Sequence, residues 1–320
     1  MSGVPEVTVL MPVRDGARWL AEAADSIRRQ SFANFEFLIV DDGSTDRTPE
    51  ILASLAALDR RVRILRQLAG GIVAALNAGL ADARAPLIAR MDADDVAHEE
   101  RLARQVAAMR ARPELAALGT FYTQIDEAGR PGRLVELPTE PGAIAAALLV
   151  SNCVAHPTTL LRRDAVLKAG GYRAGFPRCE DYDLWLRLSQ THLIANLAEP
   201  LLQYRLHADQ SGQRETRTRF LAEIAALESA RRRRTGQSDP GGLEAGELPG
   251  PYGLSRPGLR RMLRDRSLGA ARGLLGEGRR EEALQALRVA LAQGIGSPLT
   301  TLRLARLFAK AATWRWSARL

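Results

Sequence analysis

Two neighbouring acids, Asp41 and Asp42, follow the apolar run 35–40 (FEFLIV) and precede a Gly-Ser turn. A buried carboxylate without a partner is costly, so two acids at the end of an apolar strand indicate a ligand for at least one of them. Acids near sheet ends in nucleotide-binding folds accept hydrogen bonds from the ribose, and a base N–H is an equally suitable donor. Helix capping explains the following segment 44–46 (STD) but leaves the acid pair unexplained.

Three acids within four residues, Asp92, Asp94 and Asp95, follow a second apolar run at 87–91 (LIARM). Like charges this close raise one another's pKa unless a cation lies among them. Mg²⁺ and Mn²⁺ prefer hard oxygen ligands and take the remainder from substrate phosphates and water. We therefore expect Asp92 and Asp94 to bind a divalent metal and a nucleotide, while the favourable N-terminus of the next helix suffices to explain Asp95.

A third acidic segment, Glu180-Asp181, begins a predicted helix whose apolar face includes Trp185. Capping and catalysis explain this pair equally well when it is considered alone. Beside a metal–nucleotide site, an acid from a separate segment is what the activation of an acceptor hydroxyl requires. His156 and His207 are two of only four histidines. Each is more often structural than a ligand, although a neutral imidazole can complete a divalent site.

The elements that must position these residues alternate between strand and helix through the first third of the chain. This order predicts an α/β fold with a mostly parallel sheet covered on both faces. Ligands in such sheets bind beyond the carboxyl ends of the strands, which is where the acidic groups lie. The predicted strands are 7–12, 35–40, 62–65 and 87–91, and the predicted helices are 19–30, 48–58, 72–83 and 99–112.

The middle of the chain is less regular. Apolar and turn patterns there predict strands at 115–125 and beyond 156–161, a turn at 126–132, and helices at 143–149, 164–169 and 180–188.

Composition excludes several classes of protein. The 320 residues are 46% hydrophobic and 26% charged, which is typical of a globular chain. Two cysteines cannot build a disulfide framework or a four-cysteine zinc site, and they favour a reducing compartment. No uncharged apolar run is long enough for a transmembrane helix, and the N-terminus lacks the pattern of a cleaved secretory signal. We therefore expect a cytoplasmic protein.

The net charge of +8 belongs to the C-terminal third. Residues 1–212 hold 24 Lys and Arg against 27 Asp and Glu, whereas residues 213–320 hold 21 against 10. We expect a catalytic domain at 1–212 and a basic helical region at 213–320, with a Gly/Pro-rich linker at 235–258. The expected helices of that region are 214–234, 259–275, 280–292 and 299–312.

The basic region suits an anionic partner. No aromatic residue interleaves with the arginines at 231–234, which argues against single-stranded nucleic acid. A peripheral contact with the inner face of the membrane is the alternative to a merely solvated helical face.

Seven motifs, in this order and spacing, resemble those of family 2 glycosyltransferases. They are PVRDG (12–16), VDDGSTD (40–46), MDADD (91–95), AHPT (155–158), GGY (170–172), EDYDLWLRL (180–188) and YRLH (204–207). The resemblance covers about residues 5–212. It implies the GT-A fold, a Rossmann-like sheet flanked by helices. It also implies a hexosyltransferase-type enzyme that moves a sugar from a nucleotide-diphosphate donor with inversion, in bacterial cell-envelope polysaccharide biosynthesis.

The resemblance also implies how the donor is bound. Pro12 and Arg14 correspond to the loop under the nucleotide base, where many members carry an aromatic residue or Asn near the position of Arg14. Asp42 corresponds to the residue that bonds the base, and Asp41 supports it. Asp92 corresponds to the first acid of the DxD motif, near the ribose and diphosphate. UDP is the commonest nucleotide of the family.

The metal and the reaction chemistry are implied in the same way. Asp94 corresponds to the metal ligand of the DxD motif, Mn²⁺ or Mg²⁺ being the expected ion, and His207 to a histidine that reaches the metal or diphosphate. Asp181 corresponds to the general base. The residues expected to support the acceptor side are Glu180, Trp185 and His156.

Two other functions remain open from the residues alone. A sugar nucleotidyltransferase also uses acids and Mg²⁺, but a Gly-rich basic loop is expected after its first strand, and the segment 12–18 has one glycine. A non-catalytic module that binds nucleotide or a membrane surface is the second. For the glycosyltransferase, the expected partners are a nucleotide sugar and a saccharide or lipid-linked acceptor, with no nucleic acid.

Overall fold

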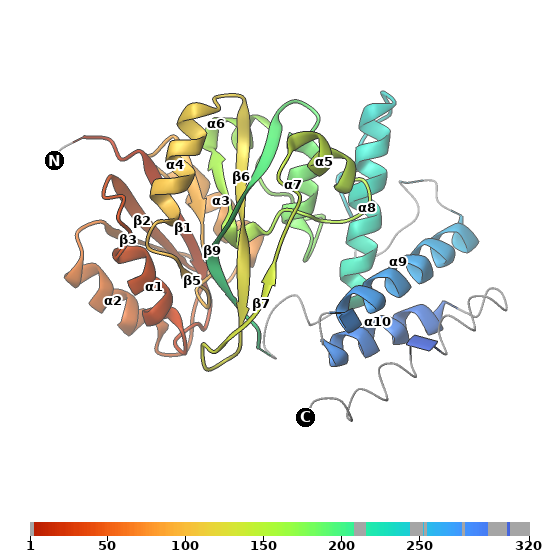
Figure 1. Cartoon of the computed structure of the whole chain (residues 1–320), viewed down its shortest axis with the longest axis horizontal. Helices are drawn as coiled ribbons and strands as arrows, with labels where there is room; N and C mark the ends of the chain where they lie inside the picture. The colour runs from red at the N-terminus through yellow and green to blue at the C-terminus, as the bar shows by residue number, and fades with distance from the viewer. Residues whose placement is uncertain are drawn as a thin grey trace. The chain divides into compact units, whose positions relative to one another are not determined.

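The computed structural model describes residues 3–207, 216–243, 252, 255–276, 279–293 and 306–307. The chain divides into two compact units, Met1–Ala174 with Glu180–His207, and Gly175–Cys179 with Ala208–Leu320. All strands of the described residues lie in the first unit, and three long helices lie in the second (Figure 1). The boundary predicted at residue 212 lies outside the described residues.

The sheet of the first unit is mixed. Among the described residues its order is β3-β2-β1-β4-β8-β6-β9-β5, with β7 beside β6. The first four neighbours are parallel, as predicted, and correspond to the four apolar runs of the first third. Beyond β4 the pairs are antiparallel except for β6 with β9. The strands are β1 (Val7–Val13), β2 (Phe35–Asp41), β3 (Val62–Arg66), β4 (Leu87–Arg90), β5 (Val96–Ala97), β6 (Leu115–Ile125), β7 (Pro131–Val135), β8 (Leu160–Arg162) and β9 (Leu193–Arg205).

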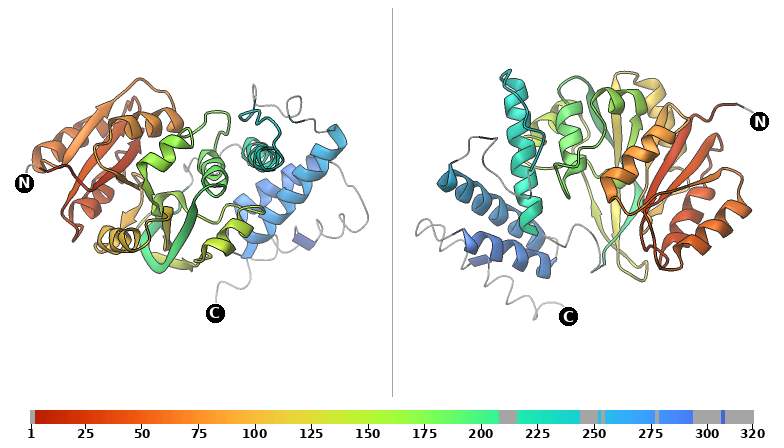
Figure 2. Two further views of the ribbon diagram at one scale, coloured as in Figure 1. Left: turned by 90° about the horizontal axis from the view of Figure 1, so that it is seen from above. Right: turned by 180° about the vertical axis from the view of Figure 1, so that it is seen from behind.

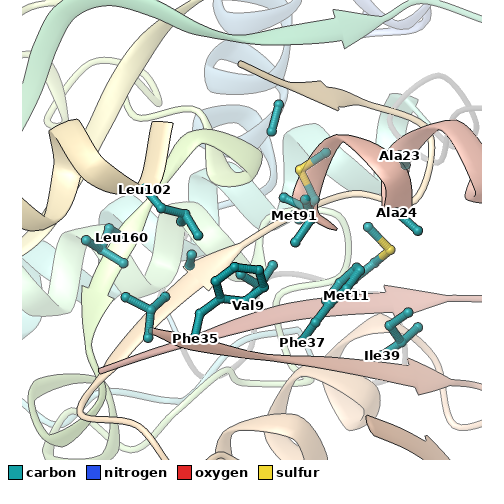
Figure 3. Packing of buried hydrophobic residues seen from close by; sticks show 14 of the residues in the cluster. Val9, Met11, Ala23, Ala24, Phe35, Phe37, Ile39, Met91, Leu102 and Leu160 are labelled. Atoms are coloured by element: carbon teal, nitrogen blue, oxygen red, sulfur yellow. The ribbon is translucent and has the colours of Figure 1, made fainter. Parts of the chain in front are cut away.

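Helices cover both faces of the parallel part of the sheet. Alternate side chains of β1 and β2, such as Val9, Met11 and Phe37, point into one core with α1, α2 and α4 (Figure 3). The opposite face packs on α3, so closely that a Cβ at Gly79 would lie 2.1 Å from Leu10 Cδ1. The right view of Figure 2, turned by 180° from Figure 1, shows the molecule from this side. The helices are α1 (Leu20–Arg28), α2 (Thr48–Leu58), α3 (Ile72–Asp82), α4 (Arg101–Ala111), α5 (Pro141–Ala147), α6 (Arg163–Lys168), α7 (Glu180–Leu188) and the 3-10 helix η1 (His156–Thr158).

Three strands were missed by sequence reasoning, the two-residue β5, β7 and β9. The predicted turn 126–132 is shorter, because β7 begins at Pro131 and pairs with β6. The long strand β9 lacks a regular alternation of buried side chains, and its register with β6 shifts near Pro200. This strand carries Arg205 to the acidic cluster, so it positions part of the site.

The second unit is helical in its described residues. The helices α8 (Thr216–Arg234), α9 (Arg256–Gly276) and α10 (Arg280–Ala292) correspond to three of the four predicted helices. The fourth, 299–312, lies outside the described residues except at 306–307. Three of the four arginines at 231–234 form ion pairs, Arg231 and Arg232 with Glu228, and Arg233 with Asp239.

Within the described part of the chain, every helix is too short or too polar to cross a bilayer.

Candidate active site

The loops that follow β1 and β2 are joined by reciprocal hydrogen bonds. Asp15, in the left-handed region at φ 51°, accepts from the backbone N–H groups of Thr45 and Asp46 through Oδ1, at 2.7 and 3.3 Å. In return, the N–H groups of Asp15 and Ala17 donate to the side chains of Ser44 and Asp46, each at 3.0 Å. Two sequence motifs therefore form one continuous surface at the carboxyl ends of these strands.

The two residues predicted to lie under the nucleotide base differ in exposure. Pro12 is buried within β1, opposite Val40 of β2. The Arg14 side chain is 55% exposed, with its Nε 3.9 Å from the Asp15 carboxylate. Only Arg14 of the two offers a side chain to a ligand.

Both acids of the first pair are buried and hold neighbouring loops. Asp41 accepts from the N–H group of Ser44 at 3.0 Å. Asp42 accepts three hydrogen bonds, from the Gln67 side chain at 2.7 Å and from the N–H groups of Gly70 and Gly71 at 2.8 Å. The Asp42 carboxylate thus ties the end of β2 to the loop that leads into α3.

The acidic cluster lies between β4 and β5. One carboxylate oxygen from each of Asp92, Asp94 and Asp95 lies within 4.8 Å of the others. Burial raises the pKa of Asp92 and of Asp95, and the negative charge of Asp94 raises both further. Such crowded, partly desolvated oxygens are the donor set that a hard divalent cation prefers, and a cation among them would relieve the repulsion.

The end of β9 and the residues that follow it bring Arg205 and His207 to this cluster. The His207 Nε2 atom lies 2.8 Å from the Asp94 carboxylate, and its ring contacts that of Trp19, with centroids 4.4 Å apart and planes tilted by 44°. Arg205 is buried and fixes the cluster through two hydrogen bonds. Its backbone N–H group donates to the Asp95 carboxylate, and its side-chain Nε donates to the Asp94 carbonyl. The structure thus brings the predicted metal ligands Asp94 and His207 into contact.

Two buried arginines near the cluster, Arg90 and Arg101, have different partners. Arg90 forms an ion pair with Asp92, and the negative charge of Asp92 raises the Arg90 pKa against the opposing effect of burial. Arg101 is fully buried and donates to acceptors that include the Arg90 carbonyl, at 2.7 Å. Burial lowers the pKa of Arg101 to about 9. Arg101 therefore has the partners of a structural residue.

The predicted general base begins α7. Asp181 accepts from the Asn152 side chain at 2.8 Å and from the N–H group of Tyr182 at 2.7 Å. Burial raises its pKa, and both hydrogen bonds oppose that shift. Two residues further on, Asp183 is fully buried in ion pairs with Arg173 and Arg187. Asp183 is therefore committed to the fold, whereas Asp181 retains some exposure.

Residues predicted to support the acceptor side form a buried network. His156 Nε2 lies 2.8 Å from the Tyr172 hydroxyl, and its ring meets Trp185 edge-on at 5.8 Å. Burial, with some help from the positive charge of Arg90, keeps the His156 pKa well below its ordinary value. Trp185 is fully buried and Glu180 is buried.

Several residues of the site were not singled out from the sequence. Asn77 of α3 clamps Tyr172, donating to its carbonyl at 2.8 Å and accepting from its N–H group at 2.9 Å. Asn152 acts through its hydrogen bond to Asp181, Trp19 through its ring contact with His207, and Arg205 through several hydrogen bonds, all over long sequence separations. Arg90 did leave a sequence signal, since it is a charge within an apolar run.

The family model for glycosyl transferase family 2 matches residues 8–170. The chain belongs to this family. Among its relatives, the O-antigen biosynthesis glycosyltransferase WbnJ of Escherichia coli is 36% identical over 63% of this chain and 80% of that protein. The putative glycosyltransferase EpsE of Bacillus subtilis (strain 168) is 33% identical over 75% of this chain and 87% of that protein.

Solved structures confirm the predicted GT-A fold with C-terminal helices. S. aureus TarS 1–349 in complex with UDP has a TM-score of 0.59 at 19% identity, covering 96% of this chain and 88% of that chain. The mannosyltransferase PcManGT from Pyrobaculum calidifontis, in complex with GDP-Man and Mn²⁺, has a TM-score of 0.56 at 19% identity, covering 98% and 84%. The family match and these relatives make the protein a glycosyltransferase, which excludes the nucleotidyltransferase and non-catalytic alternatives.

Proposed function

We propose that this glycosyltransferase moves a sugar from a nucleotide diphosphate to an acceptor hydroxyl, with a divalent metal and with inversion. The observation that carries the proposal is the acidic cluster, in which three carboxylate oxygens lie within 4.8 Å of one another beside the imidazole of His207. Crowding partly buried carboxylates costs free energy, and a bound cation would offset that cost.

The residues at this cluster fit a metal ion. Asp94 and His207 would hold it, and Asp92 would lie beside the ribose and diphosphate, because oxygen and imidazole donors suit Mn²⁺ and Mg²⁺ sites that are completed by phosphate. When bound, the ion would neutralise the charge that develops on the leaving diphosphate. Arg205 holds the backbone of Asp94 and the carboxylate of Asp95, which keeps the cluster in place before the donor arrives.

Asp181 is the proposed base. It takes the proton of the acceptor hydroxyl as the acceptor oxygen bonds to the anomeric carbon and the bond from that carbon to the diphosphate breaks. A single displacement from the opposite face inverts the anomeric centre and needs no covalent intermediate. The raised Asp181 pKa increases its affinity for the incoming proton, and general bases of this kind typically contribute about 10²–10⁴-fold in rate.

The nucleotide end of the donor is proposed to lie over the loops after β1 and β2. Arg14, Asp41 and Asp42 are the polar side chains there, with Pro12 beneath them. Asp42 already accepts three hydrogen bonds, so a base N–H would have to share Oδ2 with Gly71 or displace Gln67. We expect UDP as the nucleotide, since TarS binds UDP and UDP-GlcNAc, although PcManGT binds GDP-Man.

The acceptor is proposed to be a saccharide or lipid-linked saccharide of a bacterial cell-surface polysaccharide. Relatives named for O-antigen and amylovoran biosynthesis support this class. We expect the enzyme to act in the cytoplasm, with residues 1–212 as the catalytic domain and 213–320 as a helical appendage that contacts the membrane surface. The pairing of three arginines at 231–234 leaves less free positive charge for such a contact than the sequence alone suggested.

Calorimetric binding of UDP, GDP and a panel of nucleotide sugars, with Mn²⁺ or with EDTA, tests the proposal. We expect the parent to bind one nucleotide family in a Mn²⁺-dependent manner. Asp94→Ala should lose that dependence with little change in melting temperature, because the Asp94 side chain is partly exposed and bonds only to His207 among the described residues.

Asp164→Ala is the matched control, because Asp164 is a surface acid paired with Lys168. It should bind like the parent. Mn²⁺-dependent affinity retained in Asp94→Ala would contradict the assignment of the metal site.

A further inference from the structure

Arg90 is a buried cation with an unused hydrogen-bond donor. Its side chain is 6% exposed, and its Nη1 faces the carboxylate of Asp92 as an ion pair. Its Nε is buried and has no hydrogen-bond partner among the described residues. Strand alternation sends Ala89 and Met91 into the core under α1, so Arg90 points to the opposite face of the sheet.

Neighbouring arginines show what a structural role looks like here. The guanidinium nitrogens of Arg101 all donate hydrogen bonds, to the Gln105 side chain, to the Met91 sulfur and to backbone carbonyls. Arg162 of β8, the strand beside β4, donates to the carbonyls of Leu115 and Met109. Buried N–H groups are nearly always satisfied, and an unsatisfied one needs an explanation such as a ligand.

The surroundings of Arg90 lie on two sides of the candidate site. On one side is Asp92 of the acidic cluster. On the other, the charge of Arg90 is close enough to lower the pKa of His156 and to oppose the burial effect at Asp181. Tyr172, which bonds His156, is also within reach of this charge. Arg90 therefore pairs with the acidic cluster and also acts electrostatically on the residues around the proposed base.

In a direct displacement, the anomeric carbon lies between the leaving diphosphate and the base. We propose that Arg90 is a donor-binding residue whose Nε–H donates a hydrogen bond to an oxygen of the transferred sugar, while Nη1 keeps its ion pair with Asp92. This inference rests on the proposed function. The ion pair orients the guanidinium, which makes Arg90 a determinant of which sugar is accepted.

The test compares two dissociation constants in the full-length protein with Mn²⁺. One is for the nucleoside diphosphate, UDP or GDP, and the other is for the nucleotide sugar that binds best in the panel. Arg90→Lys keeps the positive charge but has no counterpart of the Nε donor. It should weaken the nucleotide sugar about tenfold more than the diphosphate, the scale of one lost charged hydrogen bond. Arg90→Gln should also weaken the diphosphate, because Asp92 loses its counter-ion.

Arg162→Gln is the matched control, since it removes a half-buried arginine that already has protein acceptors. It should lower the melting temperature and leave the ratio of the two constants unchanged. A parent that binds no nucleotide would refute the proposed function itself. A parent that binds, with an unchanged ratio in Arg90→Lys, would overturn the role of Arg90 alone. Failure of both Arg90 variants to fold would assign Arg90 to the fold and overturn the inference as well.

Discussion

The hydrogen bond from Asn152 to Asp181 gives a direct test of the proposed base. Its donor is the Asn152 Nδ2 atom, 2.8 Å from Oδ2 of the carboxylate. This bond favours the charged carboxylate and so lowers the Asp181 pKa, against the larger effect of burial. Removing the bond in Asn152→Ala should therefore raise the Asp181 pKa. Less of the base is then deprotonated in acid, and activity in alkali is preserved.

The size of the shift follows from the bond. Hydrogen bonds to charged groups contribute about 1.5–3 kcal/mol, and the exposed position of Asn152 favours the low end. Because one pKa unit corresponds to about 1.4 kcal/mol, the shift should be about one unit upward. Asn152→Asp should shift it further, since a second carboxylate would then replace the donor.

The assay is the pH dependence of kcat/KM, whose acid limb reports the base of the free enzyme. The acid limb should move to higher pH in the order parent, Asn152→Ala, Asn152→Asp. Asp181→Asn should transfer sugar at least about a hundredfold more slowly at every pH. Glu180→Gln is the control for an adjacent acid and should keep the parent profile. An acid limb that stays fixed in both Asn152 variants, or that moves downward, would refute the reasoning.

Two further predictions concern residues that build the site. Asp183→Asn should cost about 3–5 kcal/mol of unfolding free energy, because it removes the charge of a fully buried carboxylate that forms ion pairs with Arg173 and Arg187. Urea unfolding measures this cost, and a change below about 1 kcal/mol would be inconsistent with these ion pairs. Arg205→Lys should weaken Mn²⁺-dependent nucleotide binding, although Arg205 is not a proposed metal ligand. Lysine cannot bond the Asp94 carbonyl and the other acceptors of Arg205 at the same time. An unchanged affinity in Mn²⁺ titrations would show that the loop of Asp94 keeps its conformation without Arg205.

The first half of the fold was accessible to sequence reasoning because its signals are local. An apolar run such as 35–40 predicts β2 by itself, and the acids that follow it fall at the carboxyl end of a parallel strand by a general rule. Asp92 and Asp94 were predicted to act together for the same reason, since crowded acids are visible without any tertiary contact. Asp95 was explained by the N-terminus of the next helix, but it is fully buried within the cluster, and α4 begins only at Arg101.

What escaped prediction depends on contacts between distant segments. Arg205 reaches Asp94 and Asp95 across more than 100 residues, and no local pattern links them. Asn77 and Tyr172 are 95 residues apart, and although Tyr172 ends the GGY motif, nothing in the sequence links it to Asn77. Strand β9 was missed because its alternation is broken where its register with β6 shifts. In each case the information lies in pairing, which a single sequence does not contain.

The reciprocal bonds between the loops after β1 and β2 have a consequence for evolution and engineering. Asp15 and Asp46 each accept hydrogen bonds from the backbone of the other loop. Exchanging one loop alone would therefore leave backbone N–H groups of the other loop without their acceptors. The two loops should therefore be inherited as one cassette, with substitutions at Asp15 tolerated mainly alongside changes at 44–46. A chimera that recruits the nucleotide preference of a relative would need both loops transplanted together.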